Sequence, residues 1–232
     1  MPLPKLEAPV YTLTIPSTQE RFEYRPYTVK EEKSLLIAKE TGTEKDLINS
    51  SVALLEKCIE GINTKELTTF DFEHIFLLLR SKSAGETSDV MVECEECNKS
   101  TLMTVNLDQA YVDGEIKTPE EMTIKITDTV GVEMSYPRFT NSITEELSEI
   151  ELITTTLARC IKTIYDENGI YDARDYSDSE LIDFVESLSS QQFKEFVGLF
   201  ESIPSIAIDA KYRCEHCHHL GETKIEGLAS FF

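Results

Sequence analysis

Four cysteines, arranged as two Cys-x-x-Cys pairs, are the residues whose type and spacing point most clearly to chemistry. Cys94 and Cys97 enclose two glutamates. Cys214 and Cys217 enclose a glutamate and a histidine. Two intervening residues let a tight turn direct two thiolates at one ion, and two such turns complete the tetrahedral shell of a structural zinc site. The spacing therefore predicts one structural zinc ion per chain, bound by all four thiolates.

The distance between the two pairs along the chain constrains the fold. Residues 98–213 separate them, whereas a compact zinc site of this kind usually has about 15–20 residues between its pairs. A shared site therefore requires a fold that returns the C-terminal pair to the first one. The alternative is two separate sites, in which His216, His218 or His219 would complete the second, while the first pair has no histidine nearby.

The surroundings of each pair bear on redox chemistry. Redox-active Cys-x-x-Cys pairs normally follow a strand and begin a helix, whose dipole lowers the thiol pKa. Here alternating apolar residues, typical of strands, lie on both sides of each pair. A closed four-thiolate shell also leaves no position for water or substrate. We therefore expect a protein that is not an enzyme and has no catalytic residues, with a thiol oxidoreductase as the less favoured reading; Cys58 and Cys160 are expected in the core.

Charge argues against nucleic acid as a partner. The 232 residues include 22 Lys and Arg against 43 Asp and Glu, a net charge of −21 that is spread along the chain. Such a charge repels phosphates, and residues 86–97 contain five carboxylates and no basic residue. A zinc-ribbon module that binds nucleic acid is thus the alternative we favour less. The sequence also lacks a signal-peptide pattern and any run of about 18 apolar residues, so we expect a cytosolic protein with no membrane partner and with reduced cysteines.

Hydrophobic periodicity and capping residues predict the elements that would position the cysteines. The first half reads as a hairpin, three helices and a strand pair around Cys94, at residues 10–25, 28–41, 43–61, 70–82 and 90–107. In the second half, the pattern predicts a pair of alternating strands at residues 123–136 and a long helix at residues 144–164. Two helices that begin near Ser177 and Ser189 follow, and then a strand pair around Cys214.

The same order of elements in both halves predicts an internal duplication. We expect an α+β fold with two similar halves, residues 1–112 and 113–232, each a β-hairpin, a helical bundle and a Cys-x-x-Cys β-hairpin. A zinc-ribbon-like four-cysteine site would join the halves, either as two domains or as one integrated domain.

Two segments resemble a known family. Tyr24–Glu40 (YRPYTVKEEKSLLIAKE) and Phe70–Glu86 (FDFEHIFLLLRSKSAGE) are similar to the baseplate hub subunit and hub assembly proteins of T-even-like contractile-tailed bacteriophages. The resemblance implies a component or assembly chaperone of the tail baseplate hub, with other hub and tail proteins of the same phage as partners. It implies a place in the host cytoplasm during assembly or in the virion tail. Which hub protein is the partner, the stoichiometry and the oligomeric state stay open.

Overall fold

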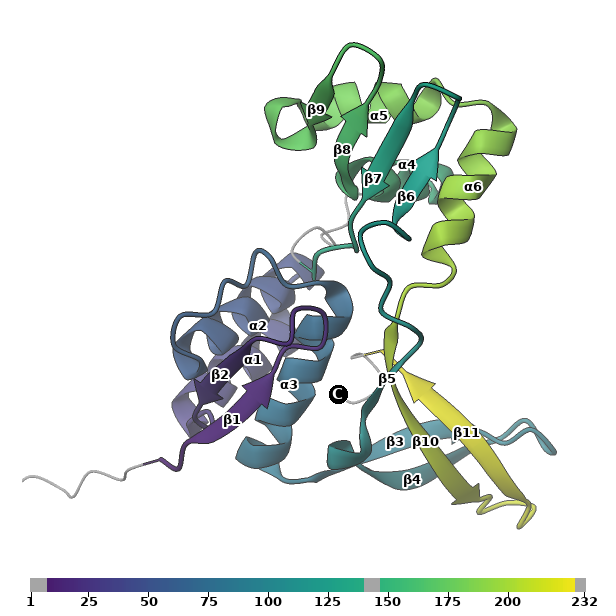
Figure 1. The fold of residues 1–232 in the computed structure, drawn as a ribbon. Coiled ribbons are helices and arrows are strands. Elements are labelled where there is room, and N and C mark those ends of the chain that lie inside the picture. The colour runs from purple at the N-terminus through teal and green to yellow at the C-terminus, as the bar shows by residue number, and fades with distance from the viewer. Residues whose placement is uncertain (1–7, 140–146, 228–232) are drawn as a thin grey trace, which may run out of the picture. The chain divides into compact units, whose positions relative to one another are not determined.

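Two units, each with its own core, make up the computed structural model, which describes residues 8–139 and 147–227 (Figure 1). The first unit comprises Met1–Asp113 and Ser205–Phe232, and the second comprises Gly114–Pro204. The described residues form six α-helices and four small antiparallel sheets. None of the helices in these ranges is long and apolar enough to cross a lipid bilayer.

The first unit combines three helices with three small sheets. In chain order its elements are β1 (Tyr11–Thr14), β2 (Arg21–Tyr24), α1 (Val29–Thr41), α2 (Glu44–Cys58), α3 (Thr69–Ala84), β3 (Thr87–Glu93), β4 (Ser100–Asn106), the 3-10 helix η1 (Leu107–Gln109), β5 (Tyr111–Asp113), β10 (Ser205–Arg213) and β11 (Leu220–Glu226). The sheets are β1–β2, β3–β4 and β11–β10–β5. Helix α3 is the most deeply buried, since Phe70, Phe72 and Phe76 are at most 1% exposed.

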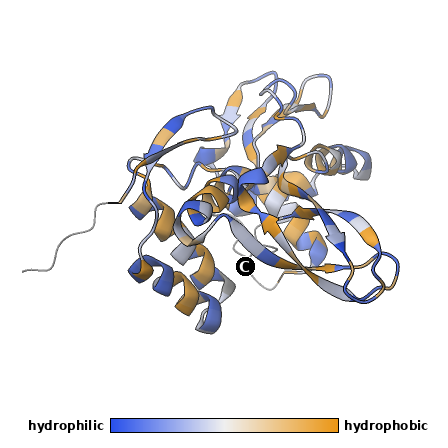
Figure 2. Cartoon of the chain, turned by 90° about the horizontal axis from the view of Figure 1, so that it is seen from below, coloured by the Kyte–Doolittle hydropathy of each residue, from blue (hydrophilic) through white to orange (hydrophobic). Residues whose placement is uncertain are grey.

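Strand patterning places one face of each Cys-x-x-Cys hairpin in the core. Along β4, exposed and buried residues alternate, with Thr101, Met103 and Val105 facing inward. Orange hydrophobic and blue hydrophilic segments alternate along the strands in Figure 2. This period of two is the signal that predicted these strands.

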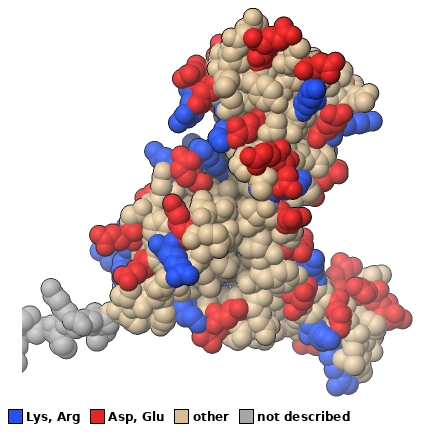
Figure 3. All heavy atoms as spheres, in the orientation of Figure 1, with Lys and Arg blue, Asp and Glu red and all other residues tan. Residues whose placement is uncertain are grey.

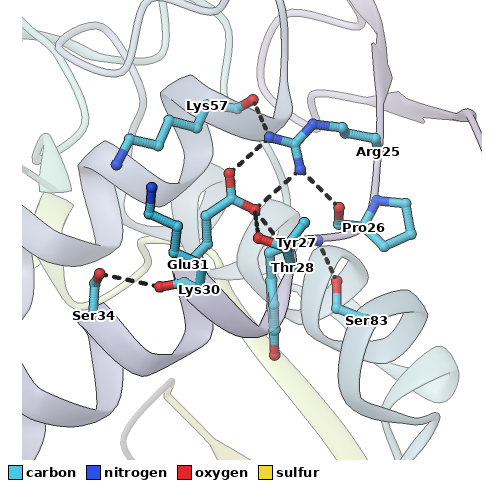
Figure 4. Close-up of polar contacts among 9 residues, drawn as sticks. All are labelled: Arg25, Pro26, Tyr27, Thr28, Lys30, Glu31, Ser34, Lys57 and Ser83. Atoms are coloured by element: carbon cyan, nitrogen blue, oxygen red, sulfur yellow. Dashed lines mark hydrogen bonds and ion pairs between the residues drawn. The ribbon is translucent and has the colours of Figure 1, made fainter. Parts of the chain in front are cut away.

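Arg25 joins three elements of the first unit (Figure 4). Its guanidinium donates two hydrogen bonds to the Glu31 carboxylate, at 2.7 and 3.1 Å, and one to the carbonyl oxygen of Lys57 at the end of α2. Glu31 also accepts from the backbone and hydroxyl groups of Thr28, which is the predicted capping box of α1. The bidentate pair therefore fixes β2, the start of α1 and the end of α2 together.

The Arg25–Glu31 pair predicts a defined pH dependence. Hydrogen bonds from Arg25, followed by those from Thr28, lower the Glu31 pKa from 4.5 to about 2. Because the folded-state pKa lies below the ordinary value, the pair stabilises the protein above about pH 4.5, and this contribution is lost as the pH falls toward 2. We expect Glu31→Gln to lower the melting temperature at pH 6 and to have a progressively smaller effect at acid pH. Thermal unfolding of both proteins over pH 3–7 tests this, and a difference independent of pH would contradict it.

A second network anchors α3. The buried Asp71 carboxylate accepts hydrogen bonds from the backbone amide and hydroxyl of Ser17, in the β1–β2 turn, and from both groups of Thr68. At the other end of α3, Lys82 forms a 2.8 Å ion pair with Asp108 of η1. Residues 24–40 and 70–86, the two segments that resemble the baseplate hub family, thus both contribute contacts that hold the first unit together.

The second unit is a four-stranded antiparallel sheet with three helices. Its elements are β6 (Thr123–Lys125), β7 (Gly131–Met134), α4 (Glu149–Arg159), β8 (Ile161–Tyr165), β9 (Ile170–Asp172), the 3-10 helix η3 (Ala173–Asp175), α5 (Asp178–Glu186) and α6 (Ser190–Phe200). The strand order is β6–β7–β8–β9. Its core includes Val132, Leu157 and Phe196, contributed by the sheet and by two of the helices.

The long helix expected at residues 144–164 is wrong in its C-terminal part. Helix α4 ends at Arg159, and Ile161–Tyr165 form strand β8; residues 144–146 lie outside the described part of the chain. The isoleucines at 161 and 164 fit a helical stripe, but residues 161–165 are rich in β-branched residues. Pairing with β7 on one side and β9 on the other decides in favour of a strand.

The two units divide the chain differently from the halves expected at 1–112 and 113–232. The second Cys-x-x-Cys hairpin, β10–β11, belongs to the first unit because β10 pairs with β5. Each half nevertheless contains a hairpin, helices and a Cys-x-x-Cys hairpin in that order, with β8–β9 additional in the second. In both halves a cysteine carbonyl oxygen at the end of a helix accepts a hydrogen bond from a backbone amide just after the hairpin, from Arg25 to Cys58 and from Ser135 to Cys160. The duplication stays a prediction that this similarity supports.

Candidate metal centre

Each cysteine pair occupies the turn of a β-hairpin. Cys94 and Cys97 lie between β3 and β4, and Cys214 and Cys217 lie between β10 and β11. Both hairpins belong to the first unit. The fold thus brings the distant C-terminal pair to the N-terminal one, as a shared site requires.

The turn of the first hairpin is closed by its own backbone. The Cys94 amide donates to the carbonyl oxygen of Lys99 at 3.0 Å, and the Asn98 amide donates to the Cys94 carbonyl oxygen at 2.8 Å. Asn98 has a φ of 53°, in the left-handed region that asparagine tolerates better than most residues. This geometry directs both sulfurs of the pair to the same side.

The second turn repeats the first. The Cys214 amide donates to the His219 carbonyl oxygen at 2.8 Å, and the His218 amide donates to the Cys214 carbonyl oxygen at 3.0 Å. His218, like Asn98, has a positive φ, 62°. In addition, the His216 amide lies 3.4 Å from the Cys214 sulfur and donates to it.

The four sulfur atoms form one cluster with the dimensions of a tetrahedral metal site. The Sγ atoms of Cys94 and Cys217 are 3.6 Å apart, as are those of Cys97 and Cys214. All four lie within 4.8 Å of one another. Ligands at about 2.3 Å from a tetrahedral zinc ion would be about 3.8 Å apart, so the spacing of the four sulfurs is compatible with a zinc site.

Two hydroxyl groups connect the hairpins in a reciprocal way. The Glu95 amide in the first turn donates to the Tyr212 hydroxyl of β10 at 3.3 Å. The Glu215 amide in the second turn donates to Thr101 Oγ1 of β4 at 2.9 Å. Glu95 and Glu215 occupy the same position in their turns, directly after the first cysteine, so each hairpin fixes the corresponding amide of the other.

The comparisons with known proteins identify the family. A family model described as T4 bacteriophage base plate protein matches residues 8–232, which include both cysteine pairs. The chain belongs to this family. Neither the curated proteins nor the solved structures gave a significant match.

Tyr212 and Thr101, whose hydroxyl groups bridge the two hairpins of this base plate protein, were not predicted as site residues from the sequence. Thr101 is fully buried, and Tyr212 is 4% exposed with its ring against Gly221. A Cβ at position 221 would lie 2.5 Å from the ring carbon that carries the Tyr212 hydroxyl. In the sequence, the spacing from the cysteines indicates these positions. Two residues before the first cysteine and four after the second, Tyr212 pairs with Gly221 in the second hairpin, and Val92 pairs with Thr101 in the first.

The thiols of the cluster differ in acidity. Hydrogen bonds to its sulfur, first from the Cys217 amide, lower the Cys214 pKa to about 6. The His219 amide acts to lower the Cys217 pKa, but desolvation and the neighbouring thiols outweigh it and raise this pKa to about 12. One thiol therefore ionises easily, whereas the full set of four thiolates needs a positive charge among them.

Access to the cluster differs between its members. Cys94 and Cys214 are fully buried, Cys97 is half-buried and Cys217 is exposed. His216 directs its Nε2 atom to the Ser100 carbonyl oxygen, at 3.2 Å. Together with the clustering of the sulfurs, this contact favours one shared site over two sites completed by histidines.

The remaining two cysteines of the base plate protein lie in apolar cores. Cys58 and Cys160 are 4% and 1% exposed. Burial raises their pKa values to about 11 and about 12. Thiols with such values are protonated at neutral pH and are poor nucleophiles and ligands, which agrees with the expectation that they are core residues.

Proposed function

We propose that this base plate protein is a non-enzymatic component or assembly chaperone of the tail baseplate hub, acting through protein–protein contacts. The observation that carries the proposal is the family match over residues 8–232. The assignment to the hub within the baseplate rests on the similarity of Tyr24–Glu40 and Phe70–Glu86 to hub proteins. The proposed partners are other hub and tail proteins of the same phage, in the host cytoplasm during assembly or in the virion tail.

One structural zinc ion per chain is part of this proposal. Bound by Cys94, Cys97, Cys214 and Cys217, it would balance the thiolate charges and hold four ligands in place. Because β3–β4 belongs to the Met1–Asp113 segment and β10–β11 to the Ser205–Phe232 segment, the ion would clasp the two chain segments that make up the first unit. A shell of four thiolates is closed, so its role is structural.

The surface agrees with a role in binding other proteins rather than nucleic acid. Figure 3 shows many red carboxylate side chains and fewer blue basic ones on the face in view. A net charge of −21 disfavours contact with phosphates and favours partners with basic surfaces. Both cysteine turns connect two strands and neither begins a helix, which gives a thiol oxidoreductase no support.

Deletion of the gene from the phage that encodes this chain tests the proposed function. We expect infected cells to accumulate unassembled tail proteins and to lack complete baseplates, because a hub part or its chaperone is missing. Sedimentation and electron microscopy of the lysates measure this. Expression of the wild-type chain from a plasmid should restore assembly, and normal tails without it would contradict the proposal.

Mass spectrometry of purified particles separates the two forms of the proposal. A hub component should be present at a fixed, whole number of copies per particle. An assembly chaperone should be found with hub proteins in infected cells and should be missing from finished particles.

A further inference from the structure

Helix α1 carries apolar side chains on two sides, and only one side is covered. Leu35 and Ala38 are buried in the first unit. Val29, Leu36 and Ile37 are 80%, 48% and 51% exposed. Their spacing of seven and eight residues places these three on one side of the helix. Together they give α1 an exposed apolar side that no described residue covers.

The charges on the exposed side of α1 differ from those of the chain as a whole. Lys30 and Lys33 are exposed on this side and form no ion pair with the described residues. Of the nearby carboxylates, Glu31 is paired with Arg25, Glu32 is half-buried at the edge of the exposed side, and Glu40 is exposed on it. We call Val29, Lys30, Lys33, Leu36 and Ile37 the α1 stripe; it combines apolar side chains with two lysines that form no ion pair with a described residue.

A second exposed apolar group lies on the outer face of the β3–β4 hairpin. Met91 and Leu102 are directly opposite each other and are 62% and 50% exposed. Asp89 and Glu93 flank Met91 on the same face, since side chains two apart in a strand share a face. Neither carboxylate forms an ion pair with a described residue, although Asp89 accepts a hydrogen bond from Thr104. We call Asp89, Met91, Glu93 and Leu102 the ribbon face; it is apolar and acidic.

The second cysteine hairpin shows that its fold does not require an apolar pair at this position. Lys211 and Glu222 occupy the places equivalent to Met91 and Leu102, three residues before the first cysteine and five after the second. They form an exposed ion pair at 2.7 Å. The exposed Met91–Leu102 pair is therefore not a structural need of such a hairpin.

We propose that the α1 stripe of one copy of this protein binds the ribbon face of a second copy. The two surfaces are complementary: each places apolar side chains at its centre, and unpaired Lys30 and Lys33 would meet unpaired Asp89 and Glu93. Their lengths match, because Val29 to Ile37 spans about 12 Å of helix and Asp89 to Glu93 spans about 13 Å of strand. This inference does not depend on the hub role.

The proposed contact joins two different surfaces, so each copy keeps one of each kind for a further copy. Contacts of this type build rings or open chains instead of closed twofold dimers. The apolar area is small, and the net charge of −21 opposes association over long distances. Association should therefore be weak at low ionic strength and stronger at about 0.15 M salt, where the Debye length is about 8 Å.

Light scattering and sedimentation of the purified full chain at 0.15 M salt measure the association. We expect the mass to rise with concentration beyond that of a dimer. Leu36→Asp combined with Ile37→Asp should weaken association at least tenfold. Met91→Lys combined with Leu102→Glu, which copies the ion pair of the second hairpin, should do the same. The matched control is Lys211→Ala combined with Glu222→Ala, which should associate like the wild type.

Mixing the two double variants gives the decisive result. One retains the ribbon face and the other retains the α1 stripe, so the mixture should form heterodimers and nothing larger, although neither variant associates alone. Exchanging the charges of Lys33 and Glu93 gives a second test. Lys33→Glu alone should weaken association, and combining it with Glu93→Lys should restore association. Melting temperature and zinc content of each variant check that it is folded. A wild-type chain that is monomeric at all concentrations, folded variants that associate like the wild type, or a mixture without heterodimers would overturn the proposal.

Discussion

Replacing Cys214 with serine is expected to abolish zinc binding and to cause the largest loss of stability of any cysteine substitution in this protein. Cys214 is fully buried and lies 3.6 Å from Cys97, and its sulfur accepts hydrogen bonds from its own turn. A serine there leaves three thiolates and an open position. A ligand present at 1,000 times its dissociation constant stabilises a fold by about 4 kcal/mol, and structural zinc sites bind tightly enough to reach this.

Elemental analysis and thermal unfolding measure the effect. The wild-type chain should contain about one zinc ion, and a chelator should lower its melting temperature to a value near that of Cys214→Ser. The same chelator should leave the variant unchanged. Zero zinc in a correctly folded wild-type protein would refute the site.

Cys58→Ser is the matched control for the cysteine chemistry. Cys58 is also buried, but it lies at the end of α2 and outside the sulfur cluster. The substitution should retain one zinc ion per chain and cause a smaller loss of stability, since it alters packing alone. Equal losses for Cys58→Ser and Cys214→Ser would argue against the assignment of the ligands.

Asp71→Ala is expected to lower the free energy of unfolding by about 3 kcal/mol or more. The carboxylate is 1% exposed and accepts hydrogen bonds from two groups of Ser17 and two of Thr68. Hydrogen bonds to a charged group are worth about 1.5–3 kcal/mol, and their loss leaves buried donors without acceptors. The substitution should also free the β1–β2 turn from α3.

Asp46→Ala provides a control with the same local chemistry. Asp46 forms an equivalent capping box with Thr43 at the start of α2, but it is exposed and bonds no distant residue in the described part of the chain. Urea unfolding of both variants should show a clearly smaller loss for Asp46→Ala. Similar losses would mean that Asp71 acts only as a helix cap and that its bonds to Ser17 contribute little.

The local elements were predictable because their causes are local. Capping boxes at Thr28 and Ser177 mark helix starts that the structure reproduces. Period-two patterning predicted the strands that flank Cys94 and Cys214. Where a short segment fits both periods, as at residues 161–165, the sequence favoured a helix, and pairing with two neighbouring strands made it β8.

By itself, the sequence determined the pairs of thiols, the turns that hold them, the acidic charge and the family. Only the tertiary structure decided that Cys94 and Cys217 meet. This contact depends on the pairing of β10 with β5, and the whole second unit separates these two strands in the sequence. The same holds for Tyr212 and Thr101, whose hydroxyls reach the opposite hairpin. Contacts between residues more than a hundred positions apart leave no periodic trace in the sequence, so they emerge only when the chain is folded.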